Sequence, residues 1–188
     1  QNIGLAIAAC FVVVLIFIAH PTTAILVTLA VALVLVDILG VCTWWDVSLN
    51  GVSVVNLTLA IGLSVDYSAH IAHAFMHKHG TRNERVTLAL SEMGVSVING
   101  GASTFLAVVV LAASNSYIFT VFFKVFFLSV VFGLAHGLVF LPVVLSIIGP
   151  DAHEDFTPQE EEEENAAVTT AKSDAEMARV RPATSTAT

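Results

Sequence analysis

The chain has 188 residues, of which 56% are hydrophobic and only 12% are charged. This composition and a mean hydropathy of +0.87 exclude an ordinary water-soluble domain, in which about 25% of residues are charged. Residues 149–188 hold ten of the fifteen acidic and three of the seven basic residues, hence −7 of the net charge of −8. The remainder is close to neutral, so the charge indicates no nucleic-acid partner.

Five apolar runs are long enough to cross a membrane core of about 30 Å, which takes about 20 residues of α-helix. These runs lie at residues 3–19, 23–41, 52–75, 95–113 and 118–148. Continuous apolar runs argue against the alternating strands of a barrel, because lipid does not satisfy open backbone groups. We therefore predict an all-α fold, a polytopic transmembrane helix bundle, over residues 1–150.

The chain begins inside an apolar run and lacks an initiator methionine, so we expect it to be a segment of a longer protein. Residues 3–19 have no basic flank and no small-residue cleavage pattern, which favours a spanning helix over a signal peptide. Cys10 and Cys42 form no disulfide framework and are interpreted as small apolar residues.

The connections between the runs differ in charge. Lys78, Arg82 and Arg85 follow the third run, whereas the connection before that run holds two tryptophans and no base. Cytoplasmic loops retain Lys and Arg and aromatic belts mark interfaces, so we expect the basic loop and the tail in the cytosol. Residues 82–94 are expected to form a short helix on the inner surface, and Asp37 to reach the outer interface without a special role.

The C-terminal residues 151–188 change abruptly to acidic, Thr, Ser and Ala residues, including five consecutive glutamates at 160–164. Such a composition cannot bury a core, so we predict a disordered acidic tail in the cytosol. A solvated tail without a partner is favoured over a regulatory motif. The organelle, whether endosomal, lysosomal or plasma membrane, is left open.

Polar chemistry is concentrated in the third run, where Gly62, Asp66, His70, His73 and His77 fall within an arc of about 80° on a helix. An ionised Asp at the bilayer centre costs about 2.5–3.5 kcal/mol, which makes Asp66 the main functional candidate, as a proton or cation relay. Gly62, one turn before, leaves space for water or a neighbouring helix. His70, one turn after, can bond to the carboxylate or pass its proton along.

Other interpretations of this stripe stay open. Asp66 and His70 would satisfy each other in a packed bundle, and His73 and His77 would suit an interfacial position. A metal-dependent intramembrane hydrolase with Asp66, His70 and His73 as ligands is geometrically possible. The sequence has no HExxH motif to supply a general base, so we expect no enzyme activity, no metal and no cofactor.

Further polar residues lie in the other runs. The candidates for lining a conduit are Asn56, Thr58, Ser96, Asn99, Ser103 and Thr104, together with His73, although small and polar residues also hold membrane helices together. Lys124 is expected to extend to the outer interface, and Pro142 to kink the last run.

Three motifs in order resemble one family. Gly62-Leu-Ser-Val-Asp66-Tyr-Ser-Ala-His70 resembles the G-x-x-x-[DE]-[FY]-x-x-H signature of the tenth transmembrane helix in Patched, Dispatched and Niemann-Pick type C proteins. Residues 48–57 resemble the entry to that helix, and His136-Gly-Leu-x-Phe-Leu-Pro-Val with Gly149-Pro150 resembles the final helix. The chain is thus similar to the RND permease superfamily.

The resemblance implies that the five runs are helices eight to twelve of a twelve-helix permease built from two pseudo-repeated halves. The partner implied is the N-terminal half, which would hold the sterol-sensing helices, and the cargo implied is a sterol or another lipid. Asp66 would supply this half's acid to the proton or cation relay, although it stands where Patched and Niemann-Pick type C proteins commonly have Glu. A sterol-responsive receptor or regulator without net transport, and an MmpL-like lipid exporter, are the alternatives.

Overall fold

The computed structural model describes residues 2–48 and 50–150, and the regular elements among them are all helical. The α-helices are α1 (Asn2–Ile18), α2 (Pro21–Trp44), α3 (Gly51–Met76), α4 (Arg82–Val109), α5 (Tyr117–Ala135) and α6 (Leu141–Ile148). A 3₁₀ turn, η1 (Val110–Ala113), extends α4, and a π-helical turn, η2 (His136–Phe140), joins α5 to α6. The all-α prediction is confirmed for the described residues; the predicted disordered tail lies outside them.

Four helical stretches are long and apolar enough to cross a membrane: Pro21–Trp44, Gly51–Met76, Arg82–Ala113 and Tyr117–Ile148. The first apolar run forms the shorter helix Ile3–Ile18. At 1.5 Å per residue that helix is about 25 Å long, slightly less than the hydrocarbon core. The described chain is therefore a multi-pass membrane bundle.

The separate surface helix predicted at residues 82–94 is wrong, because these residues form the first half of α4. A capping box begins the helix: the Glu84 carboxylate accepts from the Thr81 N–H at 2.8 Å, and the Thr81 hydroxyl accepts from the Glu84 N–H at 3.4 Å. No proline follows before Val109, and a mid-helix glycine such as Gly94 costs only about 1 kcal/mol. The helix therefore continues without a break.

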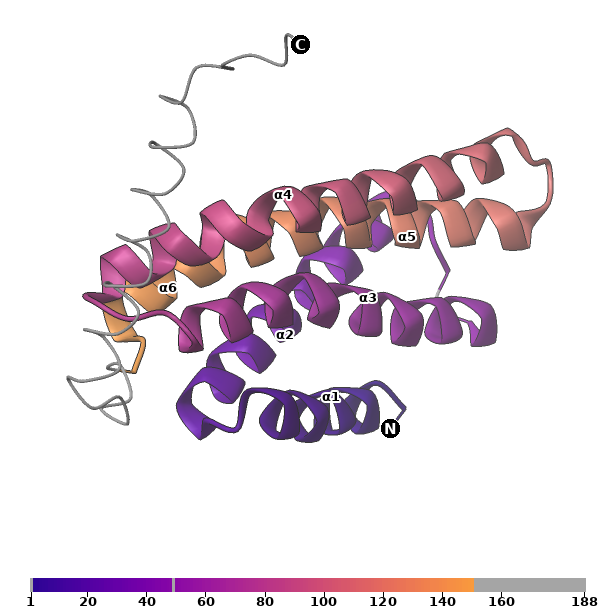
Figure 1. Cartoon of the computed structure of the whole chain (residues 1–188). Helices are drawn as coiled ribbons and strands as arrows, with labels where there is room; N and C mark the ends of the chain where they lie inside the picture. The colour runs from indigo at the N-terminus through magenta and orange to yellow at the C-terminus, as the bar shows by residue number, and fades with distance from the viewer. Residues whose placement is uncertain (1, 49, 151–188) are drawn as a thin grey trace, which may run out of the picture. The chain divides into compact units, whose positions relative to one another are not determined.

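Helix α3 lies at the centre of the described bundle and packs against α1, α2, α4 and α5 (Figure 1). One buried apolar cluster joins α2, α3 and α5, a second joins α1, α2, α3, α4 and α6, and a third joins α3 to α4. Many large apolar side chains, such as Leu5 and Ile16, remain exposed on the outside. Exposed apolar side chains are expected where lipid is the solvent.

The irregularity expected at Pro142 takes the form of the π-helical turn η2. The Leu141 N–H donates to the His136 carbonyl, five residues earlier. Proline has no N–H and its ring clashes with the carbonyl four residues before it, so an α-helical register across Pro142 is unfavourable. The wider turn relieves this clash and places His136 at the start of an irregular segment.

Two glycines let α5 and η2 approach α3 closely. A Cβ atom at Gly137 would lie 3.3 Å from the backbone carbon of Tyr67 and 3.4 Å from the backbone nitrogen of Ser68. A Cβ atom at Gly133 would lie 2.9 Å from the Tyr67 ring. Close helix contact of this kind is the usual role of small residues in membrane bundles.

Gly137→Leu is expected to destabilise the folded protein by about 1–3 kcal/mol, because the side chain has to push the α3 backbone away. Gly40→Leu is the matched control, since a Cβ atom there has no neighbour within 4 Å and the gain in helix propensity is the same. Denaturation of the full-length protein in mixed micelles would measure both. Equal stability of the two variants would contradict the close α3–η2 contact.

Arg85 connects three segments at one end of the bundle through hydrogen bonds. Its side chain is 0% exposed, and its Nε and Nη2 donate to the Phe75 carbonyl at 3.2 and 3.0 Å. Its Nη1 donates to the Pro150 carbonyl at 2.8 Å, and the guanidinium lies 4.0 Å from the Phe75 ring centroid. One side chain from α4 thus holds the last turn of α3 and the residues after α6. We call this end of the bundle the Arg85 end.

The opposite end is marked by Lys124, which donates to the Trp45 carbonyl at 2.9 Å and lies 5.4 Å from the Trp45 ring centroid. The Asn50 amide donates to the Tyr117 hydroxyl at 2.9 Å across the same end. Amphipathic aromatic residues and a lysine are common anchors at a membrane interface. The extension of Lys124 to a membrane interface stays a prediction.

Candidate functional site

The candidate site is built on one face of α3. The buried residues of this helix face α1, α2, α4 and α5. Gly62, Asp66, His70 and His77 are exposed and His73 is partly exposed. The stripe predicted from the 3.6-residue period is therefore present, and the described helices leave most of it exposed.

Asp66 and His70 form a pair one turn apart. Oδ1 of Asp66 lies 3.4 Å from Nε2 of His70, and the side chains are 65% and 50% exposed. At this separation a proton on either group allows a hydrogen bond between them. A carboxyl group and an imidazole ring thus lie in contact on a helix that is apolar enough to span a membrane.

Two cavities flank this pair. One, of about 340 Å³, lies between α3 and α1 and is lined by Gly62, Asp66 and His70 on one side and by Phe17 on the other. The second, of about 350 Å³, lies between α3 and α4, where Asp66 and His70 face Ser96 and Gly100, among others. A Cβ atom at Gly62 would have no neighbour within 4 Å. The carboxylate therefore borders open space on both sides.

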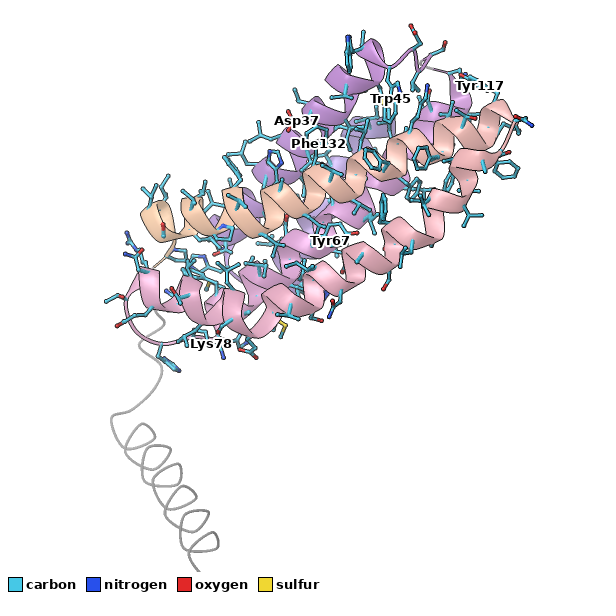
Figure 2. All side chains as sticks on the ribbon, turned by 90° about the horizontal axis from the view of Figure 1, so that it is seen from above. Asp37, Trp45, Tyr67, Lys78, Tyr117 and Phe132 are labelled. Atoms are coloured by element: carbon cyan, nitrogen blue, oxygen red, sulfur yellow. The ribbon has the colours of Figure 1, made fainter. Side chains whose placement is uncertain are left out.

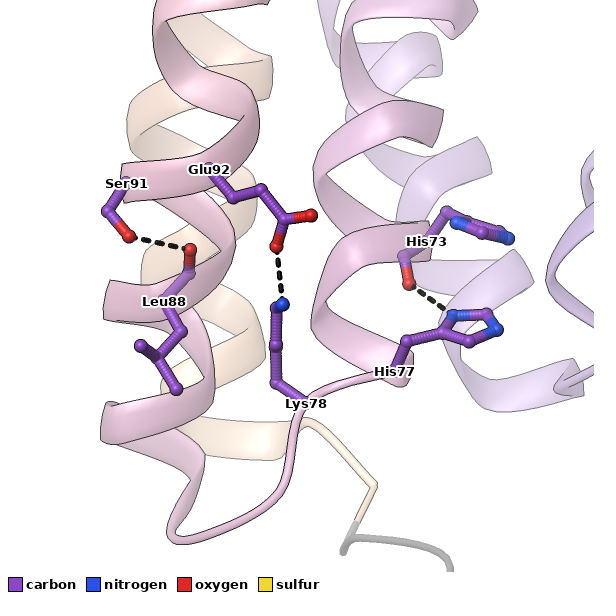
Figure 3. A network of polar contacts seen from close by, with 6 residues as sticks. All are labelled: His73, His77, Lys78, Leu88, Ser91 and Glu92. Carbon is purple, nitrogen blue, oxygen red and sulfur yellow. Dashed lines mark hydrogen bonds and ion pairs between the residues drawn. The ribbon is translucent and has the colours of Figure 1, made fainter. Parts of the chain in front are cut away.

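The stripe continues toward the Arg85 end as a row of histidine rings. The centroids of His73 and His77 are 4.3 Å apart, and the Phe17 ring lies 4.7 Å from His73. Nδ1 of His77 lies 2.9 Å from the His73 carbonyl oxygen (Figure 3). Beyond His77, the ion pair between Lys78 and Glu92 ties the α3–α4 connection to α4. The row thus runs from Asp66 to a charged edge of the bundle.

Ser96, a predicted conduit residue, lines the cavity between α3 and α4, whereas three other predicted conduit residues lie apart from this pair. Asn56 is buried at 3% exposure inside the bundle, and Asn99 is exposed on α4. The Thr104 hydroxyl donates to the Gly100 carbonyl at 3.0 Å, a bond within its own helix. None of the three is among the residues that line the two cavities beside Asp66. Their role in a conduit stays a prediction.

The geometry gives no support to a metal site in the described part of the chain. Within residues 2–48 and 50–150, no three His, Cys, Asp or Glu side chains are grouped closely enough to hold a metal ion. Asp66, His70 and His73 share a stripe, but they do not converge on one point.

The sequence model of the AcrB/AcrD/AcrF family matches residues 1–155. The chain belongs to this family of RND permeases. It is 40% identical over 150 residues to the Niemann-Pick type C1-related protein of Toxoplasma gondii, covering 79% of this chain and 13% of that protein. It is also 40% identical over 153 residues to the NPC intracellular cholesterol transporter 1 of Sus scrofa, covering 79% of this chain and 12% of that protein.

A third relative is the protein patched homolog 2 of Mus musculus, which is 39% identical over 131 residues, 69% of this chain and 11% of that protein. The predicted resemblance to Patched and Niemann-Pick type C permeases is thus confirmed. The permease segment spans about an eighth of the length of the relatives that it matches.

The permease segment also holds an ionisable pair that the sequence interpretation missed. Oδ2 of Asp37 lies 3.5 Å from Nε2 of His136, which connects α2 to η2. Asp37 was expected to reach the outer interface without a special role, and it instead meets a histidine of the last helix. The sequence does show that both residues are ionisable and interrupt apolar runs. It does not show which residues of different helices contact each other.

Proposed function

We propose that this chain is the C-terminal membrane part of a transporter of a sterol or another lipid, in which Asp66 binds the coupling proton. Two observations support the proposal. The relatives include a protein named as an intracellular cholesterol transporter, and the Asp66–His70 pair opens onto two cavities on a membrane-spanning helix. The second observation carries the proton-coupling part.

Proton binding changes the cost of placing Asp66 in the membrane. An ionised carboxylate near the bilayer centre costs about 2.5–3.5 kcal/mol, whereas the protonated acid avoids most of this cost. Protonation therefore shifts the balance between a conformation that encloses Asp66 and one that opens it to water. His70 can donate a hydrogen bond to the ionised Asp66 and accept one from the protonated Asp66, so it stabilises both states. No covalent catalysis is required, and we propose that the segment is not an enzyme.

The uncovered face of α3 needs a partner, and we infer that the N-terminal half of the same permease covers it. A side chain that is 65% exposed in this segment alone would otherwise face hydrocarbon, which is unfavourable for a carboxylate. Rocking of one half against the other around this face would convert protonation into alternating access. The basic residues Lys78 and Arg82 at the Arg85 end favour a cytosolic side for that end and for the tail under this proposal.

Lipid flux in vesicles tests the proposal. The full-length protein would be reconstituted and loaded with a labelled sterol, and flux would be compared with and without a proton gradient. Gradient-stimulated flux is the expected result. Sterol binding without flux under either condition would replace transport by the receptor or regulator function. Flux that does not respond to the gradient would retain transport and remove the coupling role of Asp66.

A further inference from the structure

Asp37 and His136 join two helices through a contact distinct from the Asp66 stripe. Oδ2 of Asp37 on α2 lies 3.5 Å from Nε2 of His136 in η2, and the His136 side chain is only 16% exposed. Asp37 lies seven residues before Trp44, the end of α2, which is about 10 Å along the helix axis. Figure 2 marks Asp37 on α2 and Phe132 on α5, the helix that leads into η2. The pair therefore lies within the spanning part of the bundle.

The contact of Nδ1, the other ring nitrogen of His136, shows which ring nitrogen carries a hydrogen in the neutral ring. Nδ1 lies 3.0 Å from the Phe132 carbonyl oxygen. A carbonyl oxygen only accepts hydrogen bonds, so Nδ1 is the donor and carries a hydrogen. In the neutral ring Nε2 is then an acceptor, and the ionised Asp37 carboxylate is also only an acceptor.

Two acceptors 3.5 Å apart repel each other, and one proton removes the conflict. A proton on Nε2 gives an imidazolium that donates to the carboxylate, and a proton on Oδ2 gives a carboxylic acid that donates to the ring. Both forms contain one more proton than the pair with a neutral ring and an ionised carboxylate. The observed contact is thus suited to hold one proton and is unfavourable without it.

The elements packed against the pair also hold other ionisable groups. From α3, Tyr67 faces η2, because its backbone lies against Gly137; a phenol stays neutral near neutral pH in the absence of a strong perturbation. From α5, Lys124 donates to the Trp45 carbonyl. Cys42, on α2, is buried in the apolar cluster of α2, α3 and α5, and Cys10, on α1, packs against that cluster.

The remaining α3 groups lie along the stripe already described. Asp66 and His70 line the cavities toward α1 and α4, and His73 packs on Phe17 of α1. At the far end of α5, Tyr117 accepts from the Asn50 amide. These groups make their contacts away from the pair. Asp37 and His136 are therefore the main influence on each other's charge.

We propose that Asp37 and His136 bind one proton between them at neutral pH and form a second intramembrane proton site, separate from Asp66. The ligand is a proton, and its binding strengthens the contact between α2 and η2. Release of the proton leaves two facing acceptors, so the π-helical turn next to Pro142 is the segment that would shift. Irregular π-helical turns are frequent at positions that carry function.

The test is to measure the proton occupancy of the pair in the full-length protein in bilayers at neutral pH. Nitrogen NMR of labelled histidine, with the His136 signals identified by their loss in His136→Gln, reports whether the ring is neutral or an imidazolium. Infrared difference spectra between wild type and Asp37→Asn report whether the Asp37 carboxyl is protonated. We expect one of the two groups, and not both, to hold the extra proton.

Three variants distinguish the possible results. Asp37→Asn should convert any His136 imidazolium to the neutral ring with hydrogen on Nδ1, because the counter-charge is lost. Asp46→Asn removes an exposed carboxylate from the α2–α3 connection and should leave the His136 signal unchanged. Asp66→Asn should also leave it unchanged, so this test does not depend on the proposed coupling role of Asp66.

A wild-type pair with a neutral ring and an ionised carboxylate would overturn the proposal, and this measurement does not depend on the folding of any variant. The proposal also fails if an imidazolium in the wild type persists unchanged in Asp37→Asn, since the proton would then not be shared with Asp37. An acidic carboxyl signal that disappears in Asp37→Asn, or an imidazolium that becomes neutral there, supports it.

Discussion

Asp66→Asn is expected to abolish the response of lipid transport to a proton gradient in the full-length permease. Asparagine keeps the shape of the side chain and its ability to bond to His70, but it does not take up a proton near neutral pH. A difference of one pH unit is worth about 1.4 kcal/mol for each coupled proton, or about a tenfold accumulation of cargo. We expect accumulation of this order in wild-type vesicles and none in the variant.

Matched controls separate coupling from folding. Asp46→Asn removes one carboxylate from an exposed position whose φ of 54° asparagine tolerates well, and it should leave the accumulation intact. His70→Gln keeps a polar partner for Asp66 and should weaken the response without removing it. Full accumulation by Asp66→Asn, at equal amounts of folded protein, would contradict the coupling role and leave the Asp66–His70 pair as a packing contact.

The membrane helices could be predicted because hydropathy alone specifies them. The predicted run 23–41 is interrupted by few polar residues and lies within α2, which begins at Pro21, a residue that is favoured in the first turn of a helix. The stripe on α3 followed from the 3.6-residue period, since Gly62, Asp66 and His70 are spaced by four. These properties are local, so they are present in the sequence before any helix packs on another.

Contacts between helices could not be predicted in the same way. The continuity of α4 depends on the capping box at Thr81 and on the packing of residues that look amphipathic and interfacial in the sequence. Asp37 and His136 are 99 positions apart, and their meeting depends on the register of α2 against the π-helical turn. Arg85 was interpreted as a loop base, because its burial depends on carbonyl groups of two other segments. Such pairings are decided by tertiary structure.

Arg85→Leu is expected to destabilise the folded permease by about 3 kcal/mol, the largest stability effect that we predict. The side chain is fully buried, and leucine would leave the Phe75 and Pro150 carbonyls without this donor. Hydrogen bonds from a charged group contribute about 1.5–3 kcal/mol, and a buried acceptor left unsatisfied costs about 1–3 kcal/mol. Part of this loss is offset because the buried charge itself is removed.

Arg85→Lys and Lys78→Leu distinguish the bonding geometry from the charge. Lysine keeps the charge of Arg85 but lacks the planar fork that reaches two carbonyls. Arg85→Lys should therefore be less stable than the wild type but more stable than Arg85→Leu. Lys78→Leu removes a charge from the same end of the bundle, but its ion pair with Glu92 is partly exposed and contributes at most about 1 kcal/mol. Denaturation in mixed micelles would rank the three variants. Equal destabilisation by Arg85→Leu and Lys78→Leu would mean that Arg85 acts only through its charge and does not fasten α3 to the residues after α6.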